Sequence, residues 1–408
     1  MMNEECARDN LLLCLRDNPH ESASGVLEKL SSQEWNDIVA LSYRHGVAPV
    51  LYQRLKTLPA AIRTPVETLG SLRRTYIYSC ARNVRLFRDL GQVVSDLQRA
   101  GIPIIILKGA HLAENIYHDI ALRPMSDIDL LVQSGDVPKA SETLISLGYS
   151  GTQRASACAI HLDPFTKPGH VDIEVHHHIV DPVQMKHVDL AGLWQRAQSI
   201  RAGGVDTLAL SPEDLLLQLC LHIAIHHGFS TDLCHLYDIR QMIESCSEKI
   251  DWCVARDRSR AWDADRSVYL ILSLTDKLLG LNLPEGFLPS LAPECPDFDF
   301  LGLSQKLIFY PGSCIPGPLA RQWGECGTFD KARILKRIFP AKEEMAHKYP
   351  VRENSLKIYF YYPMRIKQLM TRYLASIWRI LTYDEETTSA LKIEGQRNKL
   401  IAWLLSPR

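Results

Sequence analysis

Three short segments with strand-like patterns interrupt a chain that otherwise reads as helical, and they constrain the fold most. Residues 103–107 read Pro-Ile-Ile-Ile-Leu, a β-branched run that is typical of a buried strand. Residues 128–132 form a second apolar run, and residues 170–176 alternate between apolar and polar side chains with a period of two. The sequence therefore predicts a small α/β unit over about residues 101–182.

Helical patterns dominate on both sides of this unit. Residues 31–34 have capping-box spacing, and apolar side chains recur with helical period over about residues 65–99. Downstream, residues 211–214 read Ser-Pro-Glu-Asp, a strong helix start, and we expect helix from residue 190 onward. The fold class is therefore predicted as α+β, with a small core embedded in mostly helical N- and C-terminal regions.

The same patterns divide the chain into four regions. We expect a helical N-terminal region (1–100), the α/β core (101–182) and a helical domain that packs on the core (183–280). Proline and glycine cluster between residues 280 and 317, which indicates a boundary, so residues 281–408 are expected to form a further helical region.

Composition excludes several classes of protein. The 408 residues are 46% apolar and 23% charged, which is ordinary for a globular chain. Eleven cysteines without a C-x-x-C pair indicate reduced thiols and no disulfide partner. The first ten residues are acidic and polar, unlike a secretory signal, and the most apolar short run is far too short to span a bilayer. We therefore expect a cytoplasmic protein.

Two aspartates open the second predicted strand. Asp127 and Asp129 are two residues apart, so both side chains leave the same face of the strand. Paired carboxylates repel each other unless a cation lies between them. Mg²⁺ prefers oxygen ligands and leaves room for phosphate oxygens. The pair by itself is a weak signal, because two solvated acids at a strand end give the same pattern.

Three neighbouring features strengthen the metal interpretation. The first predicted strand runs into Lys108-Gly109 at a helix start, where a glycine lets phosphate approach backbone N–H groups. Arg123 lies shortly before the aspartates and offers a fixed cation for phosphate oxygens. Glu174 on the third strand can complete a triad of acids, and Asp172 on the same strand face is the alternative. Each of these features also has a purely structural alternative. Gly109 would equally suit an ordinary turn, and Arg123 would equally suit an ordinary salt bridge.

The motifs resemble a known family. The stretch LKGAHLAENIYHDIALRPMSDIDLLV, a helix ending in LGY and the strand VDIEVHHHI resemble bacterial nucleotidyltransferases of the DNA polymerase beta superfamily. The likeness is greatest to a group with an L-K-G signature and an R-P-x-x-D-x-D-x-L-V core. The upstream WNDIVALSYRHGVAPVLYQRL and the downstream LSPEDLLLQLCLHIAIHHG…LYDI also resemble this group, so the likeness covers about residues 30–245.

The resemblance implies a mixed-sheet nucleotidyltransferase core with Asp127 and Asp129 as metal ligands. It also implies a third acid on the strand 170–176, and it favours Glu174 because the family pattern there is acid–apolar–histidine. His176 then positions a phosphate or the acceptor, although a half-buried strand histidine is an equal alternative.

One departure from the family pattern concerns the turn after the first strand. The superfamily usually has Gly-Ser or Gly-Gly there, whereas this chain has Gly109-Ala110. The hydroxyl contact to phosphate is therefore missing, and Lys108 is expected to take part of that role. Because of this departure, an alternative interpretation stays open, in which the chain is a catalytically degenerate module that binds a nucleotide or a partner.

The predicted reaction is nucleotidyl transfer that depends on Mg²⁺. Asp127, Asp129 and Glu174 are expected to hold two Mg²⁺ ions, and a nucleoside triphosphate such as ATP is the donor. The acceptor is a hydroxyl or phosphate of a small molecule, a peptide or a protein, and pyrophosphate leaves. The predicted nucleotide-binding residues are Lys108, Gly109, Arg123, Ser126 and His176.

Two further features lie downstream of the core. His222 and His226 are four residues apart on one predicted helix face and can share a zinc ion, but the His-Glu-x-x-His motif is absent. A packing role is favoured for them, and together with Asp238 they can alternatively line the substrate cleft.

Residues 333–379 carry eleven basic and three acidic side chains, a net charge of +8 in a chain of net charge −1. Their aromatic and basic residues allow three interpretations. The segment is a helix that packs on the catalytic unit, a site that binds an anionic surface or partner, or a positive wall of the nucleotide cleft.

Overall fold

The computed structural model describes residues 4–16, 25–57, 62, 64–151, 160–294, 298–310, 342, 345, 349, 355, 357–367 and 385–406. The chain divides into two compact units, one of residues Met1–Ile308 with Pro407–Arg408 and one of residues Phe309–Ser406. The second unit contains α19 (Glu385–Leu405). Most of the basic segment 333–379 lies outside the described residues, so its expected role stays a prediction.

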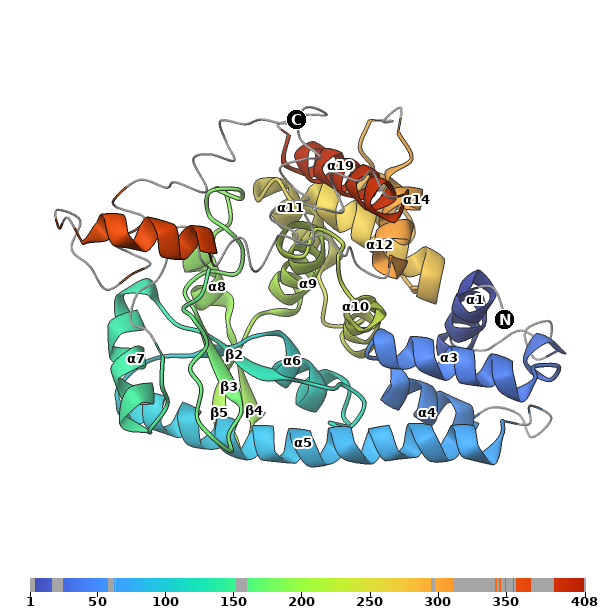
Figure 1. Cartoon of the computed structure of the whole chain (residues 1–408), viewed down its shortest axis with the longest axis horizontal. Coiled ribbons are helices and arrows are strands. Elements are labelled where there is room, and N and C mark those ends of the chain that lie inside the picture. The colour runs from blue at the N-terminus through green and yellow to red at the C-terminus, as the bar shows by residue number, and fades with distance from the viewer. Residues whose placement is uncertain are drawn as a thin grey trace. The chain divides into compact units, whose positions relative to one another are not determined.

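The first unit is built around a five-stranded mixed sheet (Figure 1). Its strand order is β3-β2-β1-β5-β4. The pairs β2–β3 and β1–β5 are parallel, and β1–β2 and β4–β5 are antiparallel. The strands are β1 (Ile105–Ile106), β2 (Asp127–Leu131), β3 (Asp172–His176), β4 (Gln198–Ala202) and β5 (Val205–Ala209). The predicted α+β class, with a small mixed sheet in helical surroundings, is confirmed.

The region that the sequence predicted to be helical from residue 190 onward begins with a helix, α8 (Leu190–Arg196), but the hairpin β4–β5 then interrupts it. Its two strands meet at Gly203-Gly204, and both glycines have positive φ, 58° and 79°. A two-residue Gly-Gly turn is a hairpin signal, but the flanking segments alternate only weakly between apolar and polar side chains, so the local pattern does not distinguish strand from helix. The sheet therefore extends beyond residue 182.

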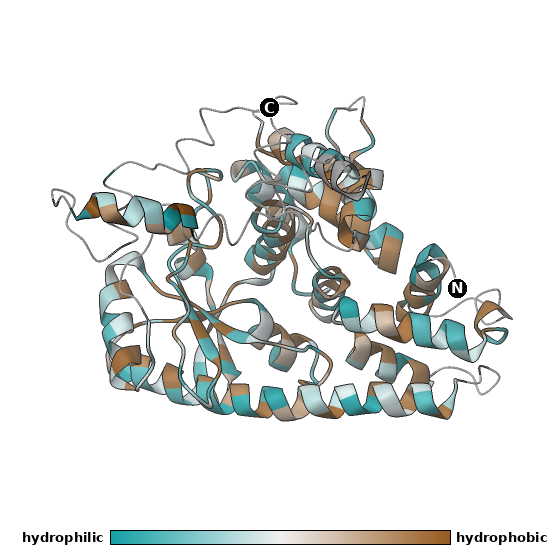
Figure 2. Cartoon of the chain, in the orientation of Figure 1, coloured by the Kyte–Doolittle hydropathy of each residue, from teal (hydrophilic) through white to brown (hydrophobic). Residues whose placement is uncertain are grey.

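The long helix α5 (Val66–Arg99) supports one face of the sheet. Its 34 residues span about 50 Å at 1.5 Å per residue, and it also contacts α4 (Ala48–Thr57) near the N-terminus. Figure 2 shows polar and apolar segments alternating along α5, as expected for a helix with one buried face. Two more N-terminal helices are α1 (Glu4–Leu15) and α3 (Ser32–Arg44), the latter with the predicted capping box between Ser31 and Glu34.

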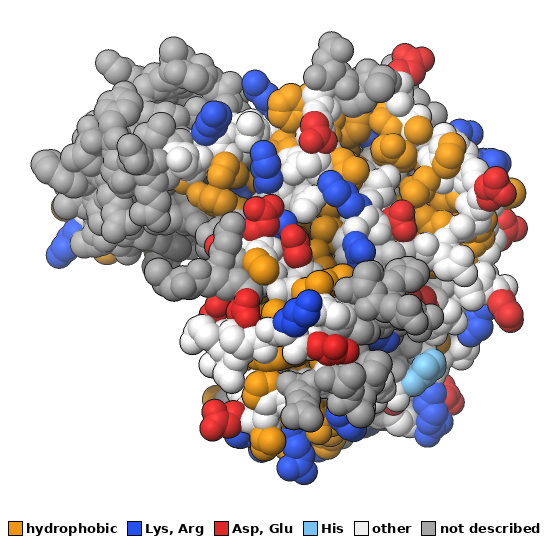
Figure 3. Space-filling view, turned by 90° about the vertical axis from the view of Figure 1, so that its right-hand side faces the viewer, with side chains coloured by type: hydrophobic (Ala, Val, Ile, Leu, Met, Phe, Trp, Pro, Cys, Tyr) orange, Lys and Arg blue, Asp and Glu red, His pale blue; other side chains and the backbone are white. Residues whose placement is uncertain are grey.

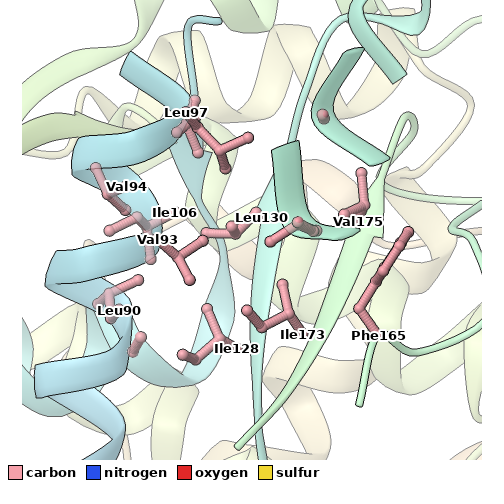
Figure 4. Close-up of a cluster of buried hydrophobic side chains, with 14 of the residues drawn as sticks. Leu90, Val93, Val94, Leu97, Ile106, Ile128, Leu130, Phe165, Ile173 and Val175 are labelled. Carbon is pink, nitrogen blue, oxygen red and sulfur yellow. The ribbon is translucent and has the colours of Figure 1, made fainter. Parts of the chain in front are cut away.

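The hydrophobic core lies between the sheet and the helices α5 and α7 (Val137–Ser146). Figure 4 shows apolar side chains of α5 packed against those of β2 and β3. The core members on the two strands are Ile128, Leu130, Ile173 and Val175. Because strand side chains alternate, residues 127, 129, 172, 174 and 176 project from the opposite face.

Helices α9 and α10 lie on that opposite side of the sheet from α5 (Figure 1). Helix α9 begins as predicted, because Ser211 caps it by accepting a hydrogen bond from the Asp214 N–H, and every residue of α9 is buried. Two π-helical turns adjoin the site: η1, which continues α6, and η3, which continues α9. The elements are α6 (Lys108–His111), η1 (Leu112–Ile116), α9 (Pro212–Leu221), η3 (His222–His226) and α10 (Leu233–Ser245).

The other elements before residue 310 are η2 (Ser134–Asp136), α8 (Leu190–Arg196), α11 (Trp252–Ala261), α12 (Asp265–Leu279), α13 (Phe287–Leu291) and α14 (Phe300–Phe309). On the face shown in Figure 3, the described acidic and basic side chains are interspersed among apolar ones. None of the helices in the described part of the chain is at once long enough and apolar enough to cross a bilayer.

Candidate active site

The site lies on the sheet face that points away from α5. Strand β2 begins at Asp127, and the parallel register places Asp127 opposite Asp172 and Asp129 opposite Glu174 on β3. Asp129 is buried and Glu174 is half-buried, whereas Asp172 is exposed at the outer end of its strand. Of the two candidate third acids, Glu174 therefore lies beside the buried aspartate.

A compact polar cluster surrounds Asp129. Its Oδ1 accepts hydrogen bonds from Nε2 of His176 at 2.7 Å and from Nζ of Lys108 at 3.3 Å. The same Nε2 lies 3.5 Å from Oε2 of Glu174. One ligand atom from each of Asp129, Glu174 and His176 lies within 4.8 Å of the other two, a spacing that suits a metal ion. The fold thus brings together side chains from three separate segments.

The electrostatics of the acids are uneven. Burial raises the pKa of Asp127, and the charges of Asp129 and Glu174 raise it further. Burial also opposes ionisation of Asp129, but Lys108 and His176 outweigh it and hold its pKa below the usual value. The hydrogen bond from His176 lowers the pKa of Glu174. Asp127 is therefore the acid of this cluster whose charge the protein compensates least, and an added divalent cation would relieve it.

His176 is buried in this cluster and contacts two of its acids. Burial by itself would lower the pKa of His176, but its hydrogen bonds to Asp129 and Glu174 raise the pKa above the usual value. Its side chain is 1% exposed, so the imidazole acts on the two carboxylates inside the protein.

The turn between β1 and α6 is tight. Lys108 has a φ of 43°, a left-handed conformation that costs a residue with a side chain about 1–3 kcal/mol. Gly109 is buried, and a Cβ there would lie 3.2 Å from both Nη1 of Arg123 and Sδ of Met125. Such strained backbone persists where the surrounding packing enforces it, and here it directs Nζ of Lys108 to Asp129.

A family model described as an uncharacterised nucleotidyltransferase matches residues 31–280. The chain belongs to this family. The match contains the whole sheet and the polar cluster, and it supports nucleotidyl transfer as the general kind of reaction. No curated protein and no solved structure matches the chain.

In this family member, the arginine of the R-P-x-x-D-x-D motif lies in a buried ion pair. Nε and Nη2 of Arg123 donate to the carboxylate of Asp238 on α10, with Nη2 at 2.8 Å, and Nη1 donates to the Pro124 carbonyl. The Tyr117 hydroxyl also donates to Asp238, at 2.8 Å. The guanidinium therefore joins the loop before β2 to α10, and this arrangement favours a positioning role over the predicted contact with phosphate.

Ser126 is exposed next to Asp127, and its hydroxyl lowers the pKa of that acid through a hydrogen bond. Its carbonyl accepts a hydrogen bond from Nη2 of Arg82 on α5 at 3.3 Å. The predicted nucleotide-binding serine is thus beside the acids and accessible.

Sequence reasoning missed two contributors to the site. The ring of His161 packs 4.9 Å from that of His176, and its Nε2 lies 3.9 Å from Oε2 of Glu174. Asn83 on α5 donates from its side-chain amide to the carbonyls of Ile120 and Arg123, which fixes the loop before β2. A histidine from a returning segment and a mid-helix asparagine carry no local signal, since only the tertiary pairing brings them to the site.

The downstream histidines form a second cluster. The rings of His222 and His226 stack with centroids 5.1 Å apart, and Nε2 of His227 lies 3.0 Å from Nε2 of His222. Burial, with added repulsion from Lys108, lowers the pKa of His222, so the ring is neutral at neutral pH. Burial, with added repulsion from Lys108, also lowers the pKa of His226, whereas Asp238 is buried as the partner of Arg123.

Proposed function

We propose that this chain is a nucleotidyltransferase that depends on Mg²⁺ and moves a nucleoside monophosphate from a nucleoside triphosphate to an acceptor hydroxyl or phosphate. The observation that carries the proposal is the convergence of Asp129, Glu174 and His176 within ligand distance in a member of a nucleotidyltransferase family. Asp127 on the same strand face adds a further carboxylate.

The donor set suits a hard divalent cation. Asp127, Asp129 and Glu174 would hold Mg²⁺, because carboxylate oxygens are its preferred protein ligands. When bound, the ions would supply charge stabilisation for the triphosphate oxygens at the reacting phosphorus. Burial and the neighbouring acids disfavour the charged form of Asp127, and such a cation would stabilise that form.

Lys108 orients the reactants, and Glu174, besides its place among the metal ligands, moves a proton. The acceptor oxygen bonds to the α-phosphorus, the bond from that phosphorus to the bridging oxygen breaks, and pyrophosphate leaves with the electron pair. Oε2 of Glu174 accepts the proton of the acceptor hydroxyl and passes it to solvent. The ammonium of Lys108, which lies on the β1–α6 turn, pairs with oxygens of the leaving pyrophosphate.

The test is pyrophosphate release by the full chain. Labelled ATP, GTP, CTP and UTP are each incubated with the protein, Mg²⁺ and a metabolite or lysate pool. The double variant Asp127→Asn, Asp129→Asn should lose release, and the matched control Asp172→Asn on the neighbouring strand should keep it. Release that persists in the double variant would overturn the proposal.

A second candidate is a nucleotide-binding module without catalysis. Lys108 already contacts Asp129, so its ammonium neutralises part of the negative charge that a metal ion would otherwise neutralise. The buried Ala110 also replaces the hydroxyl or glycine that usually follows the turn glycine. Calorimetry separates the two candidates, because a degenerate module binds nucleotide equally well with and without Mg²⁺ and releases no pyrophosphate.

A further inference from the structure

The second histidine cluster has the composition and spacing of a metal site of its own. His222, His227 and His235 each offer one ring nitrogen, and the three nitrogens lie within 4.8 Å of one another. His222 is 7% exposed, and the other two rings are partly accessible. The residues come from η3, from the turn after it and from α10. No carboxylate belongs to this group among the described residues.

The π-helical turn creates the central pair of this cluster. In an α-helix with 3.6 residues per turn, residues five apart point in different directions. In η3 the His227 N–H instead bonds to the His222 carbonyl at 3.0 Å, the i→i+5 pattern of a π-helix. This pattern brings residues five apart onto one side, and such turns occur frequently at functional sites.

The geometry of the pair fits two ligands of one ion. Nε2 of His222 and Nε2 of His227 are 3.0 Å apart, and their rings meet edge to face with centroids 4.4 Å apart. Two nitrogens bound tetrahedrally to one Zn²⁺ are about 3.3 Å apart, given Zn–N bonds of about 2.0–2.1 Å. The ion therefore fits between the two rings if their Nε2 atoms move apart by a few tenths of an ångström.

The third ring is oriented by a partner of its own. Oγ1 of Thr231 lies 2.8 Å from Nδ1 of His235. Histidines that bind metals commonly hold their other ring nitrogen in such a hydrogen bond, which fixes the ring for the ion. Nδ1 of His222, in contrast, is buried and has no hydrogen-bond partner among the residues that the structure describes, whereas its Nε2 contacts His227.

We propose that His222, His227 and His235 bind one transition-metal ion of the Zn²⁺ class, with a fourth position open to solvent or to an anionic group of a ligand. Imidazole nitrogens select Zn²⁺, Co²⁺ or Cu²⁺ over Mg²⁺, so this site differs in chemistry from the carboxylate cluster on β2 and β3. The proposal does not depend on nucleotidyl transfer.

The test uses Co²⁺ and Zn²⁺ with the full chain. Co²⁺ in a four-coordinate nitrogen site gives intense visible absorption bands, and titration calorimetry with Zn²⁺ gives the stoichiometry. With excess Mg²⁺ present to occupy the carboxylate cluster, we expect one equivalent of either ion to bind. His227→Gln and His235→Gln should abolish the bands, and Thr231→Val should weaken binding about 10–100-fold while leaving the ligands in place.

Matched controls separate this site from others. His187→Gln alters an exposed histidine that pairs with Asp263 and should bind the ion as the parent chain does, whereas Asp129→Asn alters the carboxylate cluster and should keep the absorption bands of the nitrogen site. Circular dichroism checks that each variant is folded, and Thr231→Val carries the test if a ligand variant unfolds. Absence of binding, thiolate-type absorption bands, or loss of the ion in Asp129→Asn alone would overturn the proposal.

Discussion

The carboxylate cluster and the histidine cluster differ first in the backbone that carries them. Asp129 and Glu174 project from paired strands, where a period of two and a parallel register fix which side chains share a face. His222 and His227 project from a π-helical turn, where the local change in hydrogen bonding decides which rings meet. The first pattern is regular enough to follow in a sequence, and the second is not.

The clusters also differ in how the protein treats charge. In the carboxylate cluster, hydrogen bonds between His176 and the acids raise the pKa of that imidazole despite burial. In the histidine cluster, burial and neighbouring cations lower the pKa of every ring, to about 3 for His227. The surroundings therefore favour the protonated imidazole in one cluster and the neutral ring in the other.

The largest predicted effect falls on the ion pair that joins the two regions. Arg123→Met leaves the buried carboxylate of Asp238 without its cation, and we expect a loss of about 3–5 kcal/mol in the free energy of unfolding. Urea unfolding followed by fluorescence measures it. Adding Asp238→Leu to Arg123→Met should restore part of the loss, and equal destabilisation by the single and double variants would contradict the pairing.

The next prediction concerns the acids of β3. Glu174→Gln should lower pyrophosphate release about 10²–10³-fold, the range for removing one group that acts on charge in the transition state. Asp172→Asn, two residues away on the same strand, is the control and should stay near the parent rate. If Asp172→Asn were the more damaging variant, the third acid would be Asp172.

The third prediction uses pH to test how His45 stabilises the start of α10, the helix that carries His235. Nδ1 of His45 accepts a hydrogen bond from the Leu233 N–H at the start of α10, and burial lowers the pKa of His45 to about 4. Between the unfolded value of about 6.5 and the folded value of about 4, the unfolded chain binds more protons, so stability falls as pH falls. The contribution amounts to at most about 3 kcal/mol.

Unfolding midpoints measured from pH 7 to pH 4 check this. His45→Asn removes the titrating ring and should flatten the part of the profile that His45 contributes. A variant profile parallel to that of the parent would show that His45 is not the source.

The smallest predicted effect tests the hairpin that completes the sheet. A Cβ at Gly91 would lie 2.3 Å from the carbonyl oxygen of Gly203, so Gly91→Ala forces α5 away from the hairpin turn. We expect a loss of about 1–3 kcal/mol in unfolding free energy. Gly70→Ala on the same helix meets only a flexible arginine end at 3.8 Å and should stabilise by up to about 1 kcal/mol. Equal effects of the two variants would contradict the close approach.

Sequence reasoning reached far into the carboxylate cluster. The alternation of β3 and the Asp-x-Asp start of β2 identified which carboxylates share a sheet face, and the structure brings the lysine before Gly109 to the same cluster. It reached less far elsewhere, because the hairpin β4–β5 lies in a region expected to be helical. It also gave no sign that Arg123, whose contact with phosphate stays a prediction, donates to protein acceptors.

The sequence by itself determined the fold class and the strands that carry the acids, because a period of two, a capping box and a β-branched run are local properties of neighbouring residues. Only the tertiary structure decided that His161 joins Glu174, that Arg123 pairs with Asp238, and that His235 meets the rings of η3. Those contacts join separate segments of the chain, and they depend on packing and on the π-helical register of η3.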